Sequence, residues 1–252
     1  MSKTALGLDI GSRSIEAVWL DEQGCIITYK IADSTHDPIA VARELIAHDD
    51  YDVMCATGYG RHTARDAFDC NIITEIKAYA VGAHSVFPEA RSILDIGGQD
   101  TKVISLDENG RIVDFEMNDK CAAGTGKFLE VMARALGYSL EEFVGAAESS
   151  EQSVTISSMC TVFAESEVTG LVHRGENRPA IARGLVESIS KRVITSLRRV
   201  GATPPLAFAG GVAKNSALAS LISHKFNSEI LIAEEPQIVG ALGAALCALH
   251  ES

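Results

Sequence analysis

Two cysteines stand where their thiols could serve as metal ligands. Cys121 lies in NDKCAAGTGKFLEVMARALG and Cys160 lies in SSMCTVFAESEVTGL, and each opens a stretch whose apolar residues recur at helical spacing. One chain offers only two such thiols, but a two-fold dimer would bring four together, the number that a cubane iron-sulfur cluster needs. The same four thiolates could hold a zinc ion, and two buried structural thiols are the remaining alternative.

Two glycine turns, DIGS and DIGG, could bind anionic groups. Asp9 and Asp95 end apolar strands there, and the backbone amides of the turns that follow can point at phosphate oxygens. Both carboxylates are candidate catalytic groups that could hold Mg²⁺ through its water shell. Gln99 is a candidate to orient an attacking water. The expected phosphate-binding residues are Gly11, Ser12, Arg13, Ser14, Gly97, Gly98, Asp100 and Thr101.

A third glycine site, FAGGVAKN, again ends an apolar strand and opens a helix, which suits the close approach of an adenosine. The candidate nucleotide-binding residues outside the two turns are Gly124, Gly126, Lys127, Gly210, Gly211, Lys214 and Gln237. AAGTGKF is a poor P-loop, because Cys121 replaces its first glycine and Phe128 its Ser or Thr. No GxGxxG follows a predicted strand, which disfavours a dinucleotide-binding Rossmann unit.

The order of the predicted elements is doubled. TALGLDIGSRSIEAVWLDEQGCIITYKIA predicts strand, turn, strand, turn and strand, and RSILDIGGQDTKVISLDENGRIVDFEMN repeats that plan about 85 residues later. Each half should carry an antiparallel meander extended by parallel strands that return through helices. We expect subdomains at residues 1–88 and 89–237, with an apolar helix at about 238–252 that returns to the first. Further predicted helices cover 38–48, 124–136, 178–200 and 215–226, with strands at 52–57 and 206–211.

Composition narrows the class of protein. The chain has 252 residues, 46% of them hydrophobic, and a formal charge of −12 without a run of basic residues, which argues against a nucleic-acid partner. No apolar run is long enough to span a membrane, and MSKTALGLDIGSRS is not typical of a signal peptide. Six scattered cysteines favour a reducing compartment, so we expect a cytoplasmic protein. Cys25, Cys55 and Cys247 lie in apolar runs typical of buried small side chains.

The three glycine sites, in this order, resemble the phosphate 1, phosphate 2 and adenosine motifs of the actin, Hsp70 and sugar-kinase ATPases. The resemblance covers nearly the whole chain. It implies an α/β protein with the actin-like ATPase (ribonuclease H-like) fold. Two similar subdomains are then expected, each with a mixed five-stranded sheet flanked by helices.

Within that fold the sequence resembles the ATP-dependent activators of 2-hydroxyacyl-CoA dehydratases, of the BadF/BadG/BcrA/BcrD ATPase family. The strings DIGGQDTKVI, MNDKCAAGTGKFLEVMA, SMCTVFAESEV and FAGGVAKN carry the match. The resemblance implies one 4Fe-4S cluster per homodimer, held by Cys121 and Cys160 of each subunit, and oxygen sensitivity. It also implies that binding and hydrolysis of ATP with Mg²⁺, leaving ADP, drive a low-potential electron onto an iron-sulfur dehydratase. Ferredoxin or flavodoxin is the expected electron donor.

One departure leaves the partner open. After Thr74 and Glu75 the relatives commonly continue with Ser, Cys and His, whereas this chain reads IKAYA and places Lys77 and Tyr79 near the expected phosphate site. A double-cubane cluster protein or a benzoyl-CoA reductase component is therefore an alternative partner. Two other classes of function remain: a metabolite kinase with Asp100 as its base, and a non-catalytic module that binds nucleotide. Glu165 and Glu167 are interpreted as solvated or paired with Arg134 or Arg174.

Overall fold

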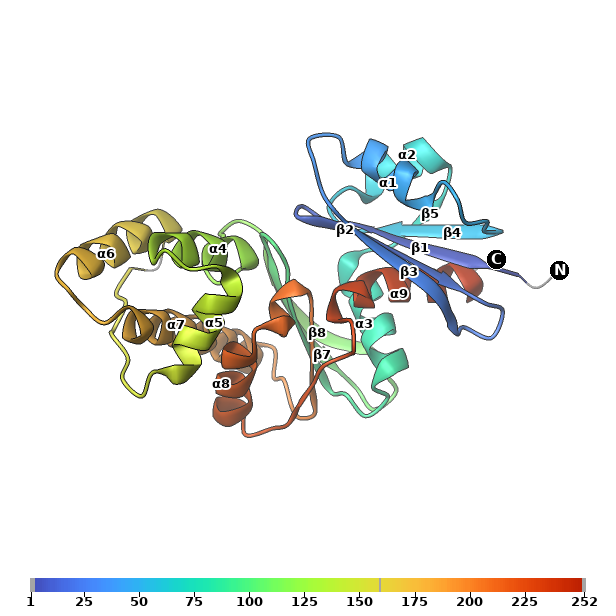
Figure 1. Ribbon diagram of the computed structural model, residues 1–252. Coiled ribbons are helices and arrows are strands. Elements are labelled where there is room, and N and C mark those ends of the chain that lie inside the picture. The colour runs from blue at the N-terminus through green and yellow to red at the C-terminus, as the bar shows by residue number, and fades with distance from the viewer. Residues whose placement is uncertain (1–2, 159, 251–252) are drawn as a thin grey trace.

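Two mixed sheets of five strands each form the framework of the molecule (Figure 1), as the repeat predicts. The computed structural model describes residues 3–158 and 160–250. The first sheet has the order β3-β2-β1-β4-β5, with β1 Ala5–Ile10, β2 Ser14–Leu20, β3 Ile26–Asp33, β4 Val53–Thr57 and β5 Asn71–Ile72. The second has the order β10-β9-β6-β7-β8, with β6 Ser92–Ile96, β7 Thr101–Leu106, β8 Ile112–Asn118, β9 Leu206–Ala209 and β10 Ile230–Leu231.

The two sheets share one topology and one register. β1, β2 and β3 are antiparallel, and β4 and β5 extend β1 in parallel; β6, β7, β8, β9 and β10 repeat this arrangement. Asp9 pairs with Glu16 across β1 and β2, and Asp95 pairs with Lys102 across β6 and β7. Each hairpin therefore presents an aspartate beside a second ionisable side chain. These second side chains have opposite charges in the two halves.

Helices cover both faces of the first sheet. Helices α1, Pro38–Ile46, and α2, Arg61–Phe68, pack on the face formed by alternate residues such as Leu6 and Leu8. Helix α9, Val239–His250, follows a short 3₁₀ turn and packs on the opposite face with Ala5 and Val18. Figure 1 shows α9 on the side of the sheet away from α1 and α2, where it contacts β1, β4 and β2.

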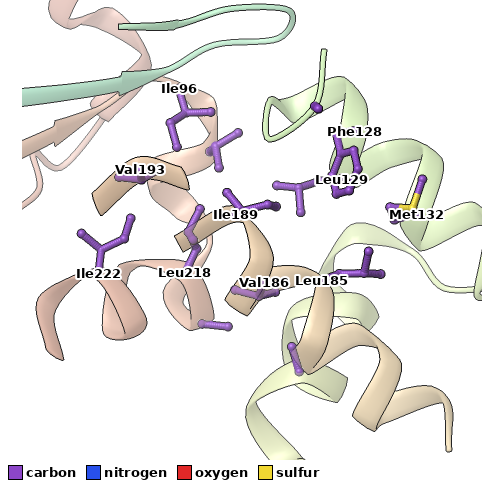
Figure 2. Close-up of a cluster of buried hydrophobic side chains, with 14 of the residues drawn as sticks. Ile96, Phe128, Leu129, Met132, Leu185, Val186, Ile189, Val193, Leu218 and Ile222 are labelled. Carbon is purple, nitrogen blue, oxygen red and sulfur yellow. The ribbon is translucent and has the colours of Figure 1, made fainter. Parts of the chain in front are cut away.

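The second sheet carries the larger core on one face. Apolar side chains of the sheet and of the covering helices meet there, among them Ile96, Phe128, Leu185, Ile189 and Leu218 (Figure 2). The helices outside the first half are α4 Gly126–Ala135, α5 Leu140–Ser149, α6 Thr161–His173, α7 Arg178–Arg199 and α8 Ser216–Phe226, with 3₁₀ turns at Gly211–Lys214 and Pro236–Ile238.

Polar side chains begin several of these helices. The Asn177 side chain accepts a hydrogen bond from the amide of Ala180 and caps α7, and Asn215 caps α8 in the same way. Ser139 and Glu142 form a reciprocal capping box at α5. The predicted helix over 124–136 begins only at Gly126, because the preceding residues form a turn in which the amide of Thr125 donates to Ala122.

Helices α3, Glu75–Val86, and α9 cross at glycines. A Cβ atom on Gly82 would lie 2.0 Å from the carbonyl oxygen of Val239, and one on Gly243 would lie 1.8 Å from that of Ala78. Only glycine permits such close backbone contact. Helix α3 also packs on the second sheet, where Tyr79 joins its buried cluster, so the division of the chain at residue 88 stays a prediction.

No helix in the described part of the chain is both long enough and apolar enough to cross a membrane.

Candidate functional site

A cleft of about 1130 Å³ opens where the β1–β2 and β6–β7 hairpins face each other. Most of the residues predicted to bind nucleotide line it: Asp9, Gly11, Ser12, Arg13, Ser14, Asp95, Gly97, Gly98, Gln99, Asp100, Gly126, Gly210, Gly211, Lys214 and Gln237. Three predicted residues are not among its lining residues. Thr101 and Gly124 line a smaller cavity of about 700 Å³ instead, and the Lys127 side chain pairs with Glu130.

The two hairpins contact each other across the cleft. A Cβ atom on Gly98 would lie 2.4 Å from Cβ of Arg13, so a larger residue at position 98 would push the turns apart. Inside each turn the same bond recurs: the amide of Gly11 donates to Ser14, and that of Gly97 donates to Asp100, both at 3.0 Å. The repeat therefore forms two equivalent turns that present their backbones to one space.

Asp9 and Asp95 occupy equivalent, buried positions at the ends of β1 and β6. A glycine with positive φ faces each carboxylate from the neighbouring parallel strand, Gly58 beside Asp9 and Gly210 beside Asp95. A Cβ atom on either glycine would lie 2.3 to 2.4 Å from the carboxylate oxygen. The fold thus keeps side-chain bulk away from both carboxylates.

Lys102 and Glu75, which the sequence reasoning missed, lie beside these carboxylates. Nζ of Lys102 is 2.8 Å from Oε2 of Glu75 and 3.0 Å from Oδ2 of Asp95, and it also contacts Asp100. The available signal was the repeat itself, because Lys102 and Glu16 both stand seven residues after the aspartate of their hairpin. Tyr79 lines the cleft as expected, and Lys77 is not among its lining residues.

Burial dominates the electrostatics of the cleft. It raises the pKa of Asp95 to about 6, against the opposing effect of Lys102, and raises the pKa of Glu16 to about 7. The pKa of Asp9 is raised well above its ordinary value by burial and by the charge of Glu16. Burial alone would lower the pKa of Lys102, but the surrounding carboxylates outweigh it, so its pKa is raised and the ammonium stays charged.

Lys214 and Gln237, predicted from separate segments, meet at the same cleft. Nζ of Lys214 donates to Oε1 of Gln237 at 2.7 Å and to Oε2 of Glu235 at 2.9 Å. Gly210 and Gly211 immediately precede this side of the cleft, and the positive φ of Gly210 turns the chain out of β9. The predicted strand over 206–211 therefore ends at residue 209.

Both candidate ligand cysteines are exposed, which excludes the interpretation of buried structural thiols. Cys160 is the N-cap of α6, as its sequence context predicts. Cys121 instead lies in a loop, with four residues between it and the start of α4. Cys55 and Cys247 are buried as expected, but the interpretation of Cys25 as a buried side chain is wrong, because it lies exposed in the turn between β2 and β3.

Hydrogen bonds connect the residues that follow Cys121 to the cleft. The amide of Gly126 donates to the carbonyl oxygen of Gly97 at 2.9 Å, and that of Lys127 donates to Gly98 at 2.8 Å. The first turn of α4 is therefore hydrogen-bonded to the β6–β7 turn. The guanidinium of Arg192 donates to the carbonyl oxygen of Ala123 at 2.8 Å and holds the loop from the other side.

Glu167 fastens the segment that precedes Cys160. Its carboxylate accepts hydrogen bonds from the amides of Ser157 and Ser158, at 2.9 and 2.8 Å. Partial desolvation opposes ionisation, but these bonds outweigh it and lower the pKa of Glu167 to about 2. The interpretation of Glu167 as solvated or paired with an arginine missed this contact, because its partners are backbone amides.

Within residues 3–158 and 160–250, no three His, Cys, Asp or Glu side chains are placed to hold a metal ion together. The two exposed thiols could supply at most half of a four-thiolate site, and three carboxylates of the cleft, those of Glu75, Asp95 and Asp100, contact Lys102.

Comparison with known proteins gives matches along the whole chain. The sequence profile of the BadF/BadG/BcrA/BcrD ATPase family matches residues 6–248. The 2-hydroxyisocaproyl-CoA dehydratase activator of Clostridioides difficile is 40% identical over 255 residues, which cover 98% of this chain and 95% of the relative. One of the subunits of the benzoyl-CoA reductase of Thauera aromatica is 30% identical over 260 residues, covering 95% of this chain and 91% of the relative.

Two solved structures are similar over nearly their full lengths. The activator of the 2-hydroxyisocaproyl-CoA dehydratase from Clostridium difficile with bound ADPNP has a TM-score of 0.89 at 39% identity, covering 100% of this chain and 95% of that one. Component A of the (R)-2-hydroxyglutaryl-CoA dehydratase of Acidaminococcus fermentans has a TM-score of 0.91 at 35% identity, covering 99% and 98%. The expected actin-like ATPase fold is thereby confirmed.

Proposed function

The chain belongs to the BadF/BadG/BcrA/BcrD ATPase family, and from that premise we propose that it is an ATP-hydrolysing electron donor that activates a 2-hydroxyacyl-CoA dehydratase. Its homodimer would hold one 4Fe-4S cluster through Cys121 and Cys160 of each subunit. The observation that carries the proposal is the continuous connection from the cleft to a cysteine loop, through the bonds from the α4 amides to Gly97 and Gly98. A change at the phosphate site would thus reach the thiol of Cys121.

Different residues of the cleft would bind different parts of the nucleotide. The amides of the two turns, around Gly11 and Gly97, would bind the phosphate oxygens of ATP or ADP, and the side where Lys214 and Gln237 meet would bind the adenosine. Gln99 lines the cleft with an exposed side chain and would orient the attacking water. Arg13 lies in the first of these turns, and its side chain pairs with Glu130 of α4 in the second half of the chain.

The residues present fit both groups that the family implies. Oδ1 of Asp95 is buried without a hydrogen-bond partner among the described residues, which suits a carboxylate that holds a water of Mg²⁺. The exposed thiols of Cys121 and Cys160 suit a cluster shared between two chains. When bound, Mg²⁺ would supply positive charge to the phosphates, and a cubane cluster would supply one-electron redox chemistry.

Two classes of partner enzyme are candidates, and each is supported by one of the relatives. The similarity to a dehydratase activator supports a dehydratase as partner. We propose further that this dehydratase is an iron-sulfur enzyme and that ferredoxin or flavodoxin is the electron donor. The similarity to a component of benzoyl-CoA reductase supports a benzoyl-CoA reductase-type partner as the alternative. A metabolite kinase of the same fold would leave the two exposed thiols at Cys121 and Cys160 without a role.

The test is metal analysis of protein purified without oxygen. Iron and acid-labile sulfide are measured per dimer, and the EPR spectrum is recorded after reduction with dithionite. We expect about four irons per dimer and the signal of a reduced cluster, both lost in Cys121→Ala and in Cys160→Ala. Cys25→Ala, which removes another exposed thiol, is the matched control and should keep both.

Three results would overturn this assignment. One is a colourless, iron-free anaerobic protein that still hydrolyses ATP. Another is stoichiometric zinc in place of iron, since zinc does not carry electrons. The third is loss of iron in the Cys25 control to the same extent as in the other two variants.

A further inference from the structure

The ammonium group of Lys102 lies where a bound cation would be expected. Its three carboxylate partners come from three separate elements: Glu75 begins α3, Asp95 ends β6, and Asp100 lies in the turn between β6 and β7. The Lys102 side chain is only 3% exposed. An ammonium group has three N–H donors, and each has a carboxylate here.

No other cation described in the structure contacts Asp95 or Asp100. Arg13 pairs with Asp33 and Glu130, Lys214 pairs with Glu235, and Arg61 pairs with Glu75 at 3.6 Å. Asp9 and Glu16 add two further buried carboxylates to the same cleft. Because a buried carboxylate without a counter-charge is strongly destabilising, Lys102 supplies the counter-charge for Glu75, Asp95 and Asp100 in the absence of ligand.

One oxygen of the Asp95 carboxylate is not taken by Lys102, and in the described part of the chain the Tyr79 hydroxyl is the only other side chain near enough to help lower the pKa of Asp95 by hydrogen bonding. Oδ2 accepts the bond from Lys102 at 3.0 Å, whereas Oδ1 is buried and has no hydrogen-bond partner among the described residues. The neighbouring Gly210 has no side chain to fill the space beside it. A buried acceptor without a partner indicates a position that another group completes.

Building on the proposed binding of a magnesium nucleotide, we propose that Lys102 is an internal counter-ion that competes with a divalent cation for Asp95 and Asp100. Without nucleotide the ammonium outcompetes the free ion, so the cleft binds Mg²⁺ weakly. The phosphates of a nucleotide add negative charge that one ammonium does not balance, and the divalent cation then enters with them. Lys102 keeps its pairing with Glu75 and so remains in the cleft as a positioning residue.

The competition is tested by divalent-cation binding rather than by activity. Mn²⁺ in place of Mg²⁺ is titrated into nucleotide-free protein, and the unbound ion is measured by EPR. We expect Lys102→Met to bind Mn²⁺ about tenfold or more tightly than the wild type, which corresponds to about 1.4 kcal/mol. Lys102→Arg keeps the charge and should resemble the wild type. Lys214→Met removes another cation of the same cleft and should also resemble the wild type.

A second variant keeps the test informative if Lys102→Met does not fold. Lys102→Met with Glu75→Gln removes one positive and one negative charge together, and it should still bind Mn²⁺ more tightly than the wild type. ADP should raise the Mn²⁺ affinity of the wild type by a larger factor than that of either variant with Lys102→Met. Wild-type affinity for Mn²⁺ in both Lys102→Met and the double variant would overturn the proposal.

This titration uses neither the cluster nor hydrolysis, so its outcome is independent of the iron analysis. A wild type that fails to bind ADP in the same experiment would count against the proposed function. Tight binding of Mn²⁺ to the nucleotide-free wild type would contradict the role proposed for Lys102 but not the proposed function.

Discussion

Replacing Glu16 with glutamine should make the protein more stable, by an amount that grows as the pH rises from 4.5 to about 7. Glu16 is 5% exposed, lies opposite Asp9 in the β1–β2 register, and has no ion-pair partner among the described residues. Burial is the main reason that its pKa rises to about 7. Glutamine has nearly the same shape but carries no charge, so the substitution removes the cost of ionising a buried group.

The size of the effect follows from the pKa. A rise from the ordinary 4.5 to about 7 corresponds to about 3 kcal/mol, at about 1.4 kcal/mol for each pH unit. Between these two values the folded state binds more protons than the unfolded state, so wild-type stability falls as the pH rises through that window. Below pH 4.5 both states are protonated and the variant should gain nothing. Above pH 7 its gain should be complete.

The assay is urea unfolding of wild type and variant at intervals between pH 4 and pH 8.5, without nucleotide and with a chelator present. The free energy of unfolding in water is compared at each pH. Glu108→Gln is the matched control, since Glu108 lies in an exposed turn after β7 and its loss removes one negative charge without burial. A difference between wild type and Glu16→Gln that does not grow across the window would refute the reasoning.

Three further outcomes are expected. Gly243→Ala should lower the free energy of unfolding in urea by about 2 kcal/mol or more, because its Cβ would lie 1.8 Å from a carbonyl oxygen of α3. Gly145→Ala, with nothing within 4 Å, should raise it by up to about 1 kcal/mol. Equal effects of the two substitutions would contradict the close crossing of α3 and α9. A double-mutant cycle on the ion pair of Arg13 and Glu130, in which Arg13 is half exposed, should give a coupling energy below about 1 kcal/mol, and a larger value would show that solvent does not screen the pair. Glu167→Gln should lower the free energy of unfolding at pH 7, and this loss should shrink as the pH falls from 4.5 towards 2, because hydrogen bonds hold the pKa of Glu167 at about 2. A loss of stability that persists in acid would show that the charge of Glu167 is not its cause.

The repeated Asp-Ile-Gly turns were enough to predict the fold. Strand alternation and glycine turns are local signals, so the meanders around Asp9 and Asp95 could be recognised from the sequence, and the position of the cleft between them followed. Thr101 was misplaced because alternation along β7 points its side chain away from Asp100 and Lys102, towards the smaller cavity. The prediction that the cleft binds nucleotide stays a proposal.

The interactions that the sequence did not predict join distant segments. Lys102 and Glu75 are 27 positions apart in the sequence, and their pairing depends on α3 passing behind the second sheet. Cys121 was expected at the mouth of a helix, but helical periodicity marks the apolar face and not the residue at which α4 begins. The hydrogen bonds of Glu167 were not predicted because its partners are backbone amides, which every residue except proline has, so no residue type in the sequence indicates them.

The place of α9 in the first sheet's core affects how the chain folds during synthesis. The face of the first sheet that includes Ala5 and Val18 is covered by residues of α9, more than 200 positions later in the chain. At about 5 to 20 residues per second, synthesis leaves that face without its cover for roughly 10 to 50 seconds. Until translation passes residue 250 that face of the nascent first sheet is an open apolar surface, and a chain stopped at residue 238 should bind an apolar dye that the full-length protein does not.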